Sequence, residues 1–232
     1  MPVAIITGAS KGLGRALAAA LAGRGWDLVV DARTRAALDD AVRDLAGHGG
    51  RVHAVAGDVT DEGHRAELVA RARALGGLDL LVNNASALGA EPLVRLDELA
   101  LEGLRRALET NVVAALGLVQ ESLPLLRASR AGGAVINVSS DAGAEAYETW
   151  GGYGASKAAL DQLSAVLGAE ERGLRVWAVD PGDMGTDLYR AAVPGDVEPR
   201  PEPREVVPAF LRLLDERPAS GRYDASSLLV AS

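Results

Sequence analysis

The stretch VAIITGASKGLGRALAAALAGRG, residues 3–25, decides the expected fold. A short apolar run typical of a strand is followed by Gly8, Gly12 and Gly14 and then by a segment with helical periodicity. Glycines at such a turn let the backbone approach a pyrophosphate, which the unpaired N–H groups of the helix N-terminus can bind. The spacing is G-x-x-x-G-x-G rather than the commoner G-x-G-x-x-G, and a plain tight turn would also use glycines. We nevertheless predict that this segment binds a dinucleotide.

Short apolar runs alternate with helical segments along most of the chain. The predicted strands are residues 3–6, 27–30, 51–54, 78–82, 134–138 and 174–179. Two helices have clear start signals, Thr34 before residues 35–47 and Asp61 before residues 62–75. Because the strands are apolar on both faces, the sequence predicts an α/β fold, a single-domain, Rossmann-like, doubly wound parallel β-sheet with helices on both faces, over residues 1–232.

Two segments interrupt this alternation. Residues 86–96 follow the fourth predicted strand as a loop, and residues 189–203 combine prolines with charges, which disfavours both helix and strand. Loops at the carboxyl ends of parallel strands bind ligands in such folds, so we expect a substrate loop at about residues 183–203. A plain surface loop would have the same composition.

The composition excludes several classes of protein. A formal net charge of -8 argues against a nucleic-acid partner, and 232 residues with 48% hydrophobic residues suit one core. The absence of cysteine excludes disulfides and thiol nucleophiles, and His48, His53 and His64 lack metal-ligand spacing and are expected on the surface. We therefore expect no metal. Without a membrane-spanning stretch or a signal peptide, the expected location is cytoplasmic, with no membrane partner.

The residues after the second predicted strand bear on the choice of dinucleotide. An acid about 20 residues past the glycines favours the ribose 2′-OH of NAD, whereas an arginine favours the 2′-phosphate of NADP. Asp31 lies 23 residues after Gly8 and Arg33 lies 25 residues after it, so distance leaves both open. Lys11 is a second cation that can reach the same phosphate. We predict NADP(H), with NAD(H) less favoured; a solvated charge for Arg33 and a helix cap for Asp31 are the alternatives.

Lysine occupies only two positions, Lys11 and Lys157, although the chain contains 24 Lys+Arg. Lys157 follows Tyr153 by four residues, so on a helix the two side chains project from one face. An ammonium near a phenol, helped by the positive charge of an oxidised nicotinamide, lowers the pKa of the phenol from about 10 toward the range of efficient acid–base catalysis. A buried tyrosine beside a snorkelling lysine would have the same spacing.

Together these residues resemble the short-chain dehydrogenase/reductase family, from the first strand to about Leu188. The resemblance rests on Thr7 to Gly14, Asp58-Val59, Asn83-Asn84-Ala85, Asn111, Ser140, Tyr153 to Lys157, Pro181-Gly182 and Thr186. All four asparagines, at positions 83, 84, 111 and 137, fall on or next to these motifs. Ala32 stands where the family has the acid that selects NAD, which favours NADP. Ser86 departs from the family's frequent glycine and leaves the shape of that loop open.

The resemblance implies a role for each of these residues. Ser140 would hold a substrate oxygen beside the hydroxyl of Tyr153, and Asn111 would anchor a water that links Lys157 to solvent. These four form the implied catalytic set; a polar residue at a helix kink is the alternative for Asn111. The implied cofactor site contains Gly8, Ser10, Lys11, Gly12, Leu13, Gly14, Arg33, Asp58, Val59, Asn84, Ala85, Tyr153, Lys157, Pro181, Gly182 and Thr186.

The expected function is that of an NADP(H)-dependent oxidoreductase that interconverts a ketone or aldehyde and an alcohol by hydride transfer, with the tyrosine as general acid and base, acting mainly as a carbonyl reductase. The alternatives are a non-catalytic cofactor-sensing or scaffold protein, and an isomerase, epimerase or dehydratase on the same platform. The expected partners are a small carbonyl or alcohol substrate and further copies of the chain. The family commonly forms dimers or tetramers, and residues 112–126 are apolar enough for such an interface or for a fully buried helix.

Overall fold

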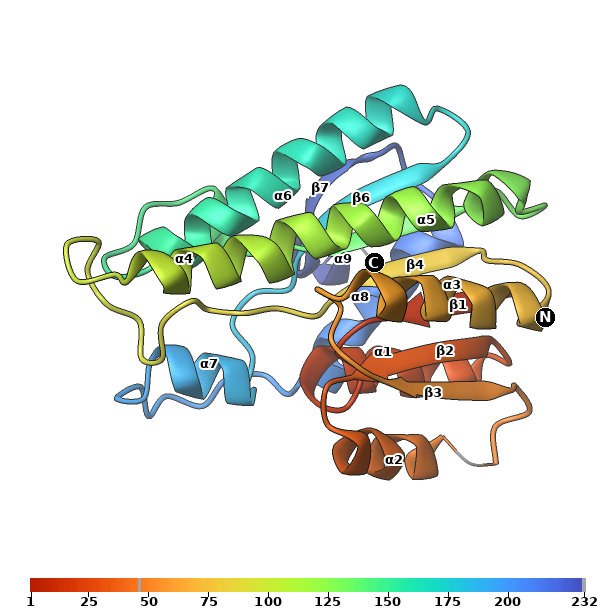
Figure 1. Cartoon of the computed structure of the whole chain (residues 1–232), viewed down its shortest axis with the longest axis horizontal. Helices are drawn as coiled ribbons and strands as arrows, with labels where there is room; N and C mark the ends of the chain where they lie inside the picture. Colours follow the sequence, from red (N-terminus) through yellow and green to blue (C-terminus); the bar gives the residue numbers. More distant parts are fainter. Residues whose placement is uncertain (46, 231–232) are drawn as a thin grey trace.

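A computed structural model describes residues 1–45 and 47–230 of the chain, and within these residues seven strands form one sheet (Figure 1). The strands are β1 (Val3–Ile6), β2 (Asp27–Ala32), β3 (Val52–Ala56), β4 (Leu80–Asn83), β5 (Ala134–Val138), β6 (Arg175–Asp180) and β7 (Gly221–Asp224). All six neighbouring pairs are parallel, in the order β3-β2-β1-β4-β5-β6-β7. The predicted doubly wound parallel sheet is therefore confirmed.

Helices connect the strands and cover both faces of the sheet (Figure 1). They are α1 (Gly12–Gly23), α2 (Arg35–Asp44), α3 (Glu62–Leu75), α4 (Leu101–Leu108), the π-helix η1 (Glu109–Val113), α5 (Ala114–Ala128), the 3₁₀ turn η2 (Asp141–Gly143), α6 (Gly151–Glu170), α7 (Asp187–Ala192), α8 (Pro203–Glu216) and α9 (Ala225–Val230). Among the residues that the structure describes, no helix is long and apolar enough to cross a bilayer.

Successive residues of each strand pack on opposite faces, as the pleat requires. In β1, Ala4 and Ile6 join a core cluster with α1 and α8, whereas Val3 and Ile5 join a second cluster with α3 and α5. Both clusters are buried, which explains why the strand sequences are apolar without alternation.

Most predicted elements are confirmed: the boundaries of the strands differ by at most two residues, and α2 ends three residues before the predicted end. Thr34 lies at the N-cap of α2 but makes no side-chain cap bond, whereas Asp61 accepts a 2.7 Å bond from the N–H of His64 at the start of α3. Ala46, inside the segment predicted as the first of these helices, lies outside the described residues. Residues 86–96 form a loop as expected.

Three predictions need correction. Residues 189–203 are not wholly irregular, because Thr186 caps a short helix, α7, that includes Tyr189 to Ala192, and Pro203 begins α8. Strand β7 was not predicted, because its sequence GRYD has no apolar run. His64 is not on the surface: its residue exposure is 8%, and its ring reaches from α3 to Asp31 near the end of β2.

The order of the strands places a crevice where the chain changes direction in the sheet. β1 lies between β2 and β4, so the connections that follow β1 and β4 leave toward opposite faces of the sheet. Thr7, directly after β1, donates its N–H to Val82 O at 3.0 Å and accepts the N–H of Asn84 on its hydroxyl at 2.9 Å. The two strand ends are thus bonded together beneath the crevice.

Candidate active site

The glycine loop and β4 are packed too closely for side chains. A Cβ atom on Gly14 would lie 2.5 Å from both the carbonyl oxygen of Gly8 and Nδ2 of Asn84, and Gly8 itself has a positive φ of 65°. Asn84 also donates through Nδ2 to the carbonyl of Thr7 at 2.8 Å. The glycines therefore let the first turn of α1 approach the end of β4 and leave its backbone facing the crevice.

The N-terminus of α1 has the features of an anion site. Its N-cap, Lys11, is extended and makes no side-chain cap bond, so the N–H groups of the first turn have no partner from that side chain. Gly12 and Leu13 line the cleft in front of this turn. The residues present thus fit the pyrophosphate of a dinucleotide, because such groups bind to unpaired N–H donors at a helix start.

Asp31 is buried, and its carboxylate binds groups of the protein itself. Its Oδ1 accepts the N–H of Gly8 at 2.7 Å, and its Oδ2 lies 2.9 Å from Nε2 of His64. Burial raises the pKa of Asp31, although the hydrogen bonds from His64 and Gly8 favour the carboxylate. Neither the helix-cap alternative nor a free ribose-binding carboxylate describes this residue, because both of its oxygens bind other parts of the chain.

Arg33 and Lys11 both line the cleft and are exposed. The ammonium of Lys11 lies 3.1 Å from Oδ2 of Asp187, the first residue of α7. An exposed pair of this kind contributes about 0–1 kcal/mol, so Lys11 can leave Asp187 for a stronger anion at little cost. The pair also links the glycine loop to α7, whose first residue lines the cleft.

One cleft of about 260 Å³ contains most of the predicted site. Ser140 lines it, and so do 15 of the 16 predicted cofactor residues: Gly8, Ser10, Lys11, Gly12, Leu13, Arg33, Asp58, Val59, Asn84, Ala85, Tyr153, Lys157, Pro181, Gly182 and Thr186. Gly14 and Asn111 do not line it. The predicted residues, far apart in the sequence, thus surround one space.

Gly14 is the one predicted cofactor residue that does not line the cleft. Gly14 is buried beneath the loop, where its missing side chain lets β4 and α1 meet. Its effect on the cleft is therefore indirect.

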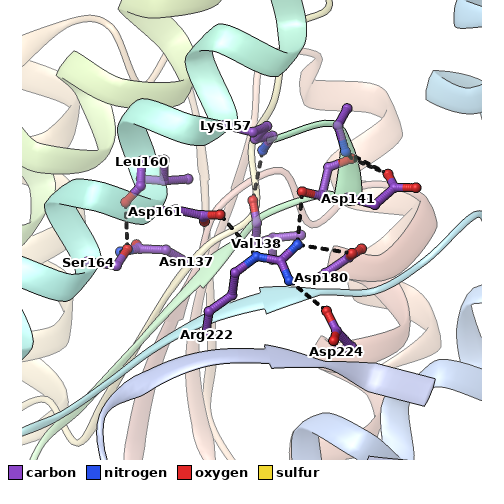
Figure 2. Close-up of polar contacts among 12 residues, drawn as sticks. Asn137, Val138, Asp141, Lys157, Leu160, Asp161, Ser164, Asp180, Arg222 and Asp224 are labelled. Atoms are coloured by element: carbon purple, nitrogen blue, oxygen red, sulfur yellow. Dashed lines mark hydrogen bonds and ion pairs between the residues drawn. The ribbon is translucent and has the colours of Figure 1, made fainter. Parts of the chain in front are cut away.

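Tyr153 and Lys157 project from one face of α6 into the cleft, both buried. The ammonium of Lys157 lies 5.4 Å from the centre of the Tyr153 ring and donates to the carbonyl oxygen of Val138 at 2.7 Å. Figure 2 shows this bond between α6 and the end of β5. Burial lowers the pKa of Lys157 to about 8, opposed by the charge of Asp161.

The lowered pKa expected for Tyr153 depends in part on the positive charge of an oxidised nicotinamide and stays a prediction, because the chain by itself does not lower this pKa. Burial raises the pKa of Tyr153 to about 12, opposed by hydrogen bonds with the hydroxyls of Ser86 and Ser140 and reinforced by the carboxylates of Asp180 and Asp141. The largest of these effects is the desolvation of the charged phenolate. At neutral pH the phenol keeps its proton.

Ser140 lies at the end of β5, next to the tyrosine hydroxyl. Its own hydroxyl donates to Oδ1 of Asp141 at 3.0 Å and accepts the N–H of Ala142 at 3.2 Å, which caps η2. Asp141 also accepts the hydroxyl of Tyr147 on Oδ2 at 3.1 Å. An ionisable group therefore adjoins the predicted substrate-binding serine.

Asn111 lies in the π-helix η1 next to Thr110, which lines the cleft, and is almost fully buried. Its Nδ2 donates to Ala87 O at 2.9 Å and to Ser156 Oγ at 2.8 Å, and its Oδ1 accepts the N–H of Ala87 at 2.8 Å. The residue thus joins the loop after β4 to α6. This contact pattern favours the alternative role, a polar residue at a helix irregularity, and leaves the water anchor untested.

The sequence analysis missed several residues that line the cleft. Asp141, Asp180 and Asp183 are all in its lining: Asp180 is the last residue of β6, and the other two each lie three residues past the end of a strand. That position was the available signal, since ligands in open α/β sheets bind at the carboxyl ends of the strands. Trp150 and Met184 also line the cleft, whereas Tyr147 does not.

Comparison with known proteins agrees with this geometry. A family model described as short chain dehydrogenase matches residues 2–196. The chain belongs to the short-chain dehydrogenase/reductase family. Members of this family are NAD(P)-dependent oxidoreductases, and the residues that carry the resemblance lie around the cleft.

Two curated relatives and one solved structure illustrate the likeness. The chain is 39% identical over 198 residues to cis-4-hydroxycyclohexanecarboxylate dehydrogenase of Sinomonas cyclohexanicum, covering 84% of this chain and 78% of the relative. It is 33% identical over 199 residues to L-xylulose reductase of Bos taurus, covering 82% and 74%. An alcohol dehydrogenase from the archaeon Thermococcus sibiricus, solved in complex with 5-hydroxy-NADP, superposes with a TM-score of 0.86 at 27% identity, covering 97% of this chain and 95% of that one.

Within the family, this chain is an oxidoreductase. The family's serine, tyrosine and lysine are present at the cleft as Ser140, Tyr153 and Lys157. Three carboxylates, Asp141, Asp180 and Asp183, line the same space.

Proposed function

We propose that the chain is an NADP(H)-dependent carbonyl reductase in which Tyr153 gives a proton to the substrate oxygen. The observation that carries this proposal is the meeting of the Tyr153 and Ser140 hydroxyls in the same cleft as the glycine loop. Ser140 would hold the carbonyl oxygen beside the phenol, and the N-terminus of α1 would hold the pyrophosphate. The bound nucleotide would supply the hydride.

The protonation of the site favours the reducing direction. A tyrosine whose pKa is raised to about 12 is a proton donor at neutral pH and a poor proton acceptor. Lys157, with a pKa lowered to about 8, can take up a proton and pass it toward the tyrosine near neutral pH. Both features suit delivery of a proton to an oxygen that becomes an alcohol.

Arg33 and Lys11 support the choice of NADP(H). Both are exposed cations at the adenosine end of the cleft, and Asp31, the competing acid, binds Gly8 and His64 instead. The solved relative in complex with 5-hydroxy-NADP agrees with this assignment without deciding it. An arginine is the favoured partner of a ribose 2′-phosphate in such folds.

The test is oxidation of the reduced nucleotide in the presence of a panel of ketones and aldehydes, followed by its absorbance with NADPH and with NADH. The proposal expects turnover with NADPH and at least one carbonyl. Tyr153→Phe should reduce kcat by about 10²–10⁴-fold and change the Kd for NADPH by less than about threefold, because general acid catalysis contributes on that scale. Tyr223→Phe, whose hydroxyl binds Ala219 O away from the cleft, is the matched control.

Two results would count against the proposal. Binding of NADPH without turnover of any carbonyl would favour the cofactor-sensing alternative. Conversion of a substrate without net oxidation of the nucleotide would favour an isomerase, epimerase or dehydratase.

We also propose that copies of the chain associate through α5 and α6, as a dimer or tetramer. Val113, Leu116 and Val166 are large apolar side chains exposed on or beside these helices. Sedimentation velocity should show a species larger than a monomer, and Leu116→Asp should shift it toward the monomer. The expected cytoplasmic location remains a prediction.

A further inference from the structure

The side chain of Arg222, from β7, lies across the ends of the neighbouring strands (Figure 2). Its Nε lies 3.1 Å from Oδ2 of Asp161, and its Nη1 lies 2.7 Å from Oδ1 of Asp224. Its Nη2 lies 3.2 Å from both Oδ2 of Asp180 and the carbonyl oxygen of Ser140. One guanidinium therefore joins α6, β5, β6 and its own strand.

Two of these contacts are with Ser140 and with Asp180, which both line the cleft. The carbonyl oxygen of Ser140 also accepts the N–H of Gly143 at 3.0 Å, so Arg222 binds the same atom that begins η2. Asp180 precedes Pro181 and accepts the N–H of Gly182 on its other oxygen at 2.9 Å. Arg222 thus contacts both the serine segment and the turn after β6.

The contact with Asp161 links Arg222 to α6, the helix that carries Tyr153 and Lys157. Asp161 follows Lys157 by four residues on α6, so it lies one turn along the same face. Its Oδ1 has no hydrogen-bond partner among the described residues, whereas its Oδ2 binds Arg222. Arg222 therefore holds a carboxylate whose charge helps Lys157 to stay protonated.

Two of the carboxylates that Arg222 contacts are largely buried, so they depend on it for a partner of opposite charge. The side chains of Asp161 and Asp180 are only 17% and 10% exposed, and that of Arg222 is 31% exposed. Removing the cation would leave two largely buried carboxylates without their shared partner, which is unfavourable unless the segments that carry them move. Those segments belong to the catalytic site.

We propose that Arg222 is a positioning residue of the reductase site, which holds the Ser140 backbone, the Asp180–Gly182 turn and α6 in their relative places. The inference rests on the proposed function for the roles of Ser140 and Lys157. The planar guanidinium suits this task because its separate N–H groups reach four acceptors, whereas a lysine ammonium is a single point charge. The register of β6 with β7, which pairs Ala178 with Arg222 and Asp180 with Asp224, brings the side chain to this edge.

The experiment compares Arg222→Met and Arg222→Lys with the control Arg212→Met. Arg212 is 28% exposed and likewise binds a carboxylate, Glu216, and a carbonyl, Leu228, each at 2.7 Å, but none of the three lines the cleft. The measurements are kcat and KM for a carbonyl substrate with NADPH, and amide hydrogen exchange of residues 139–143 and 180–183.

The proposal expects Arg222→Met to lower kcat by about 10–100-fold with KM changed less than about threefold, because small displacements of catalytic groups cost rate on that scale. Exchange at Gly143 and Gly182 should be faster than in the wild type. Arg222→Lys should restore part of kcat through its charge, and Arg212→Met should change neither measurement. If Arg222→Met does not fold, Arg222→Lys and the double variant Arg222→Met with Asp161→Asn, which removes one uncompensated carboxylate, take its place.

Wild-type kcat in the Arg222 variants overturns the proposal, whether or not exchange changes. If the wild type reduces no carbonyl, the proposed function has failed but the positioning role is still tested by exchange alone. In that case, faster exchange of both segments in the Arg222 variants than in Arg212→Met supports the role, and equal exchange overturns it.

Discussion

Nε2 of His64 lies 2.9 Å from Oδ2 of Asp31, and both side chains are buried beneath the glycine loop. The other oxygen of Asp31 accepts the N–H of Gly8 at 2.7 Å. A chain of contacts therefore runs from α3 through the end of β2 to the loop that we assign to the pyrophosphate. The contact connects the stability of α3 with the shape of the cofactor site.

This pair predicts a pH-dependent contribution to stability. The hydrogen bond to Asp31 raises the pKa of His64, against the effect of burial, and the charges of Asp31, Glu67 and Asp61 act in the same direction. A histidine whose folded pKa is raised stabilises the fold fully below its unfolded pKa of about 6.5 and loses that contribution as the pH rises through the folded value. His64→Gln should therefore cost about 1–3 kcal/mol near pH 5.5 and less at pH 8.5.

Urea denaturation of wild type and His64→Gln between pH 5.5 and 8.5 measures this difference. His48→Gln, at an exposed histidine, is the control and should give a difference near zero throughout. A difference for His64→Gln that grows with pH would contradict the assigned direction.

The exposed cations at the adenosine end predict selective effects on nucleotide affinity. Arg33→Asp should weaken NADPH binding by about 10–100-fold, because the 2′-phosphate would lose a charge-assisted partner and face a carboxylate, and should leave NADH binding nearly unchanged. Lys11→Ala should have a smaller effect in the same direction, with a steeper loss at low salt. Fluorescence titration with each nucleotide measures the two Kd values.

Arg35→Ala is the control for these variants, since Arg35 is exposed nearby but pairs with Asp39 on α2 and does not line the cleft. Equal weakening of NADH and NADPH by Arg33→Asp would mean that the residue does not recognise the phosphate.

The close packing at Gly14 predicts a steric effect. In Gly14→Ala the new Cβ atom would lie 2.5 Å from the backbone oxygen of Gly8, so the glycine loop must shift. We expect a loss of about 1–3 kcal/mol in stability, the usual scale of overpacking, and at least tenfold weaker NADPH binding. Thermal denaturation and titration measure these effects; Gly173→Ala, where a Cβ atom meets nothing within 4 Å, should show neither.

The burial of the Lys157 ammonium predicts that this residue lowers the stability of the fold although activity requires it. Its pKa is lowered to about 8 because the charged form is buried, so the folded state is penalised at neutral pH. Since the unfolded pKa is near 10.4, wild-type stability should rise as the pH increases from about 8 to 10. Lys157→Met should remove this dependence and increase stability by about 1–3 kcal/mol at pH 7, while it abolishes turnover.

Denaturation of both proteins between pH 6.5 and 9.5 tests the stability part, with Lys11→Met as the exposed control. If Lys157→Met is less stable than the wild type at pH 7, the bond from Lys157 to Val138 O outweighs the burial of the charge.

The comparison of sequence and structure is instructive at particular residues. The strands β1, β2, β4, β5 and β6 were predictable because both of their faces are buried, and the glycine loop because its spacing has a steric reason. Strand β7 was not predictable, because GRYD is ordered by pairing with β6 and by the contacts of Arg222 rather than by its own hydrophobicity. Helix α7 was missed because Thr186 provides its cap within a segment rich in prolines.

The sequence alone determined the parallel sheet, the glycine loop and the spacing of Tyr153 and Lys157, because local periodicity and conformational freedom are properties of neighbouring residues. Only the tertiary structure decided the protonation of that pair, the burial of His64 against Asp31 and the contacts of Arg222 with Ser140 and Asp180. These depend on desolvation and on charges brought together from distant parts of the chain, and neither can be read from the order of residues along it.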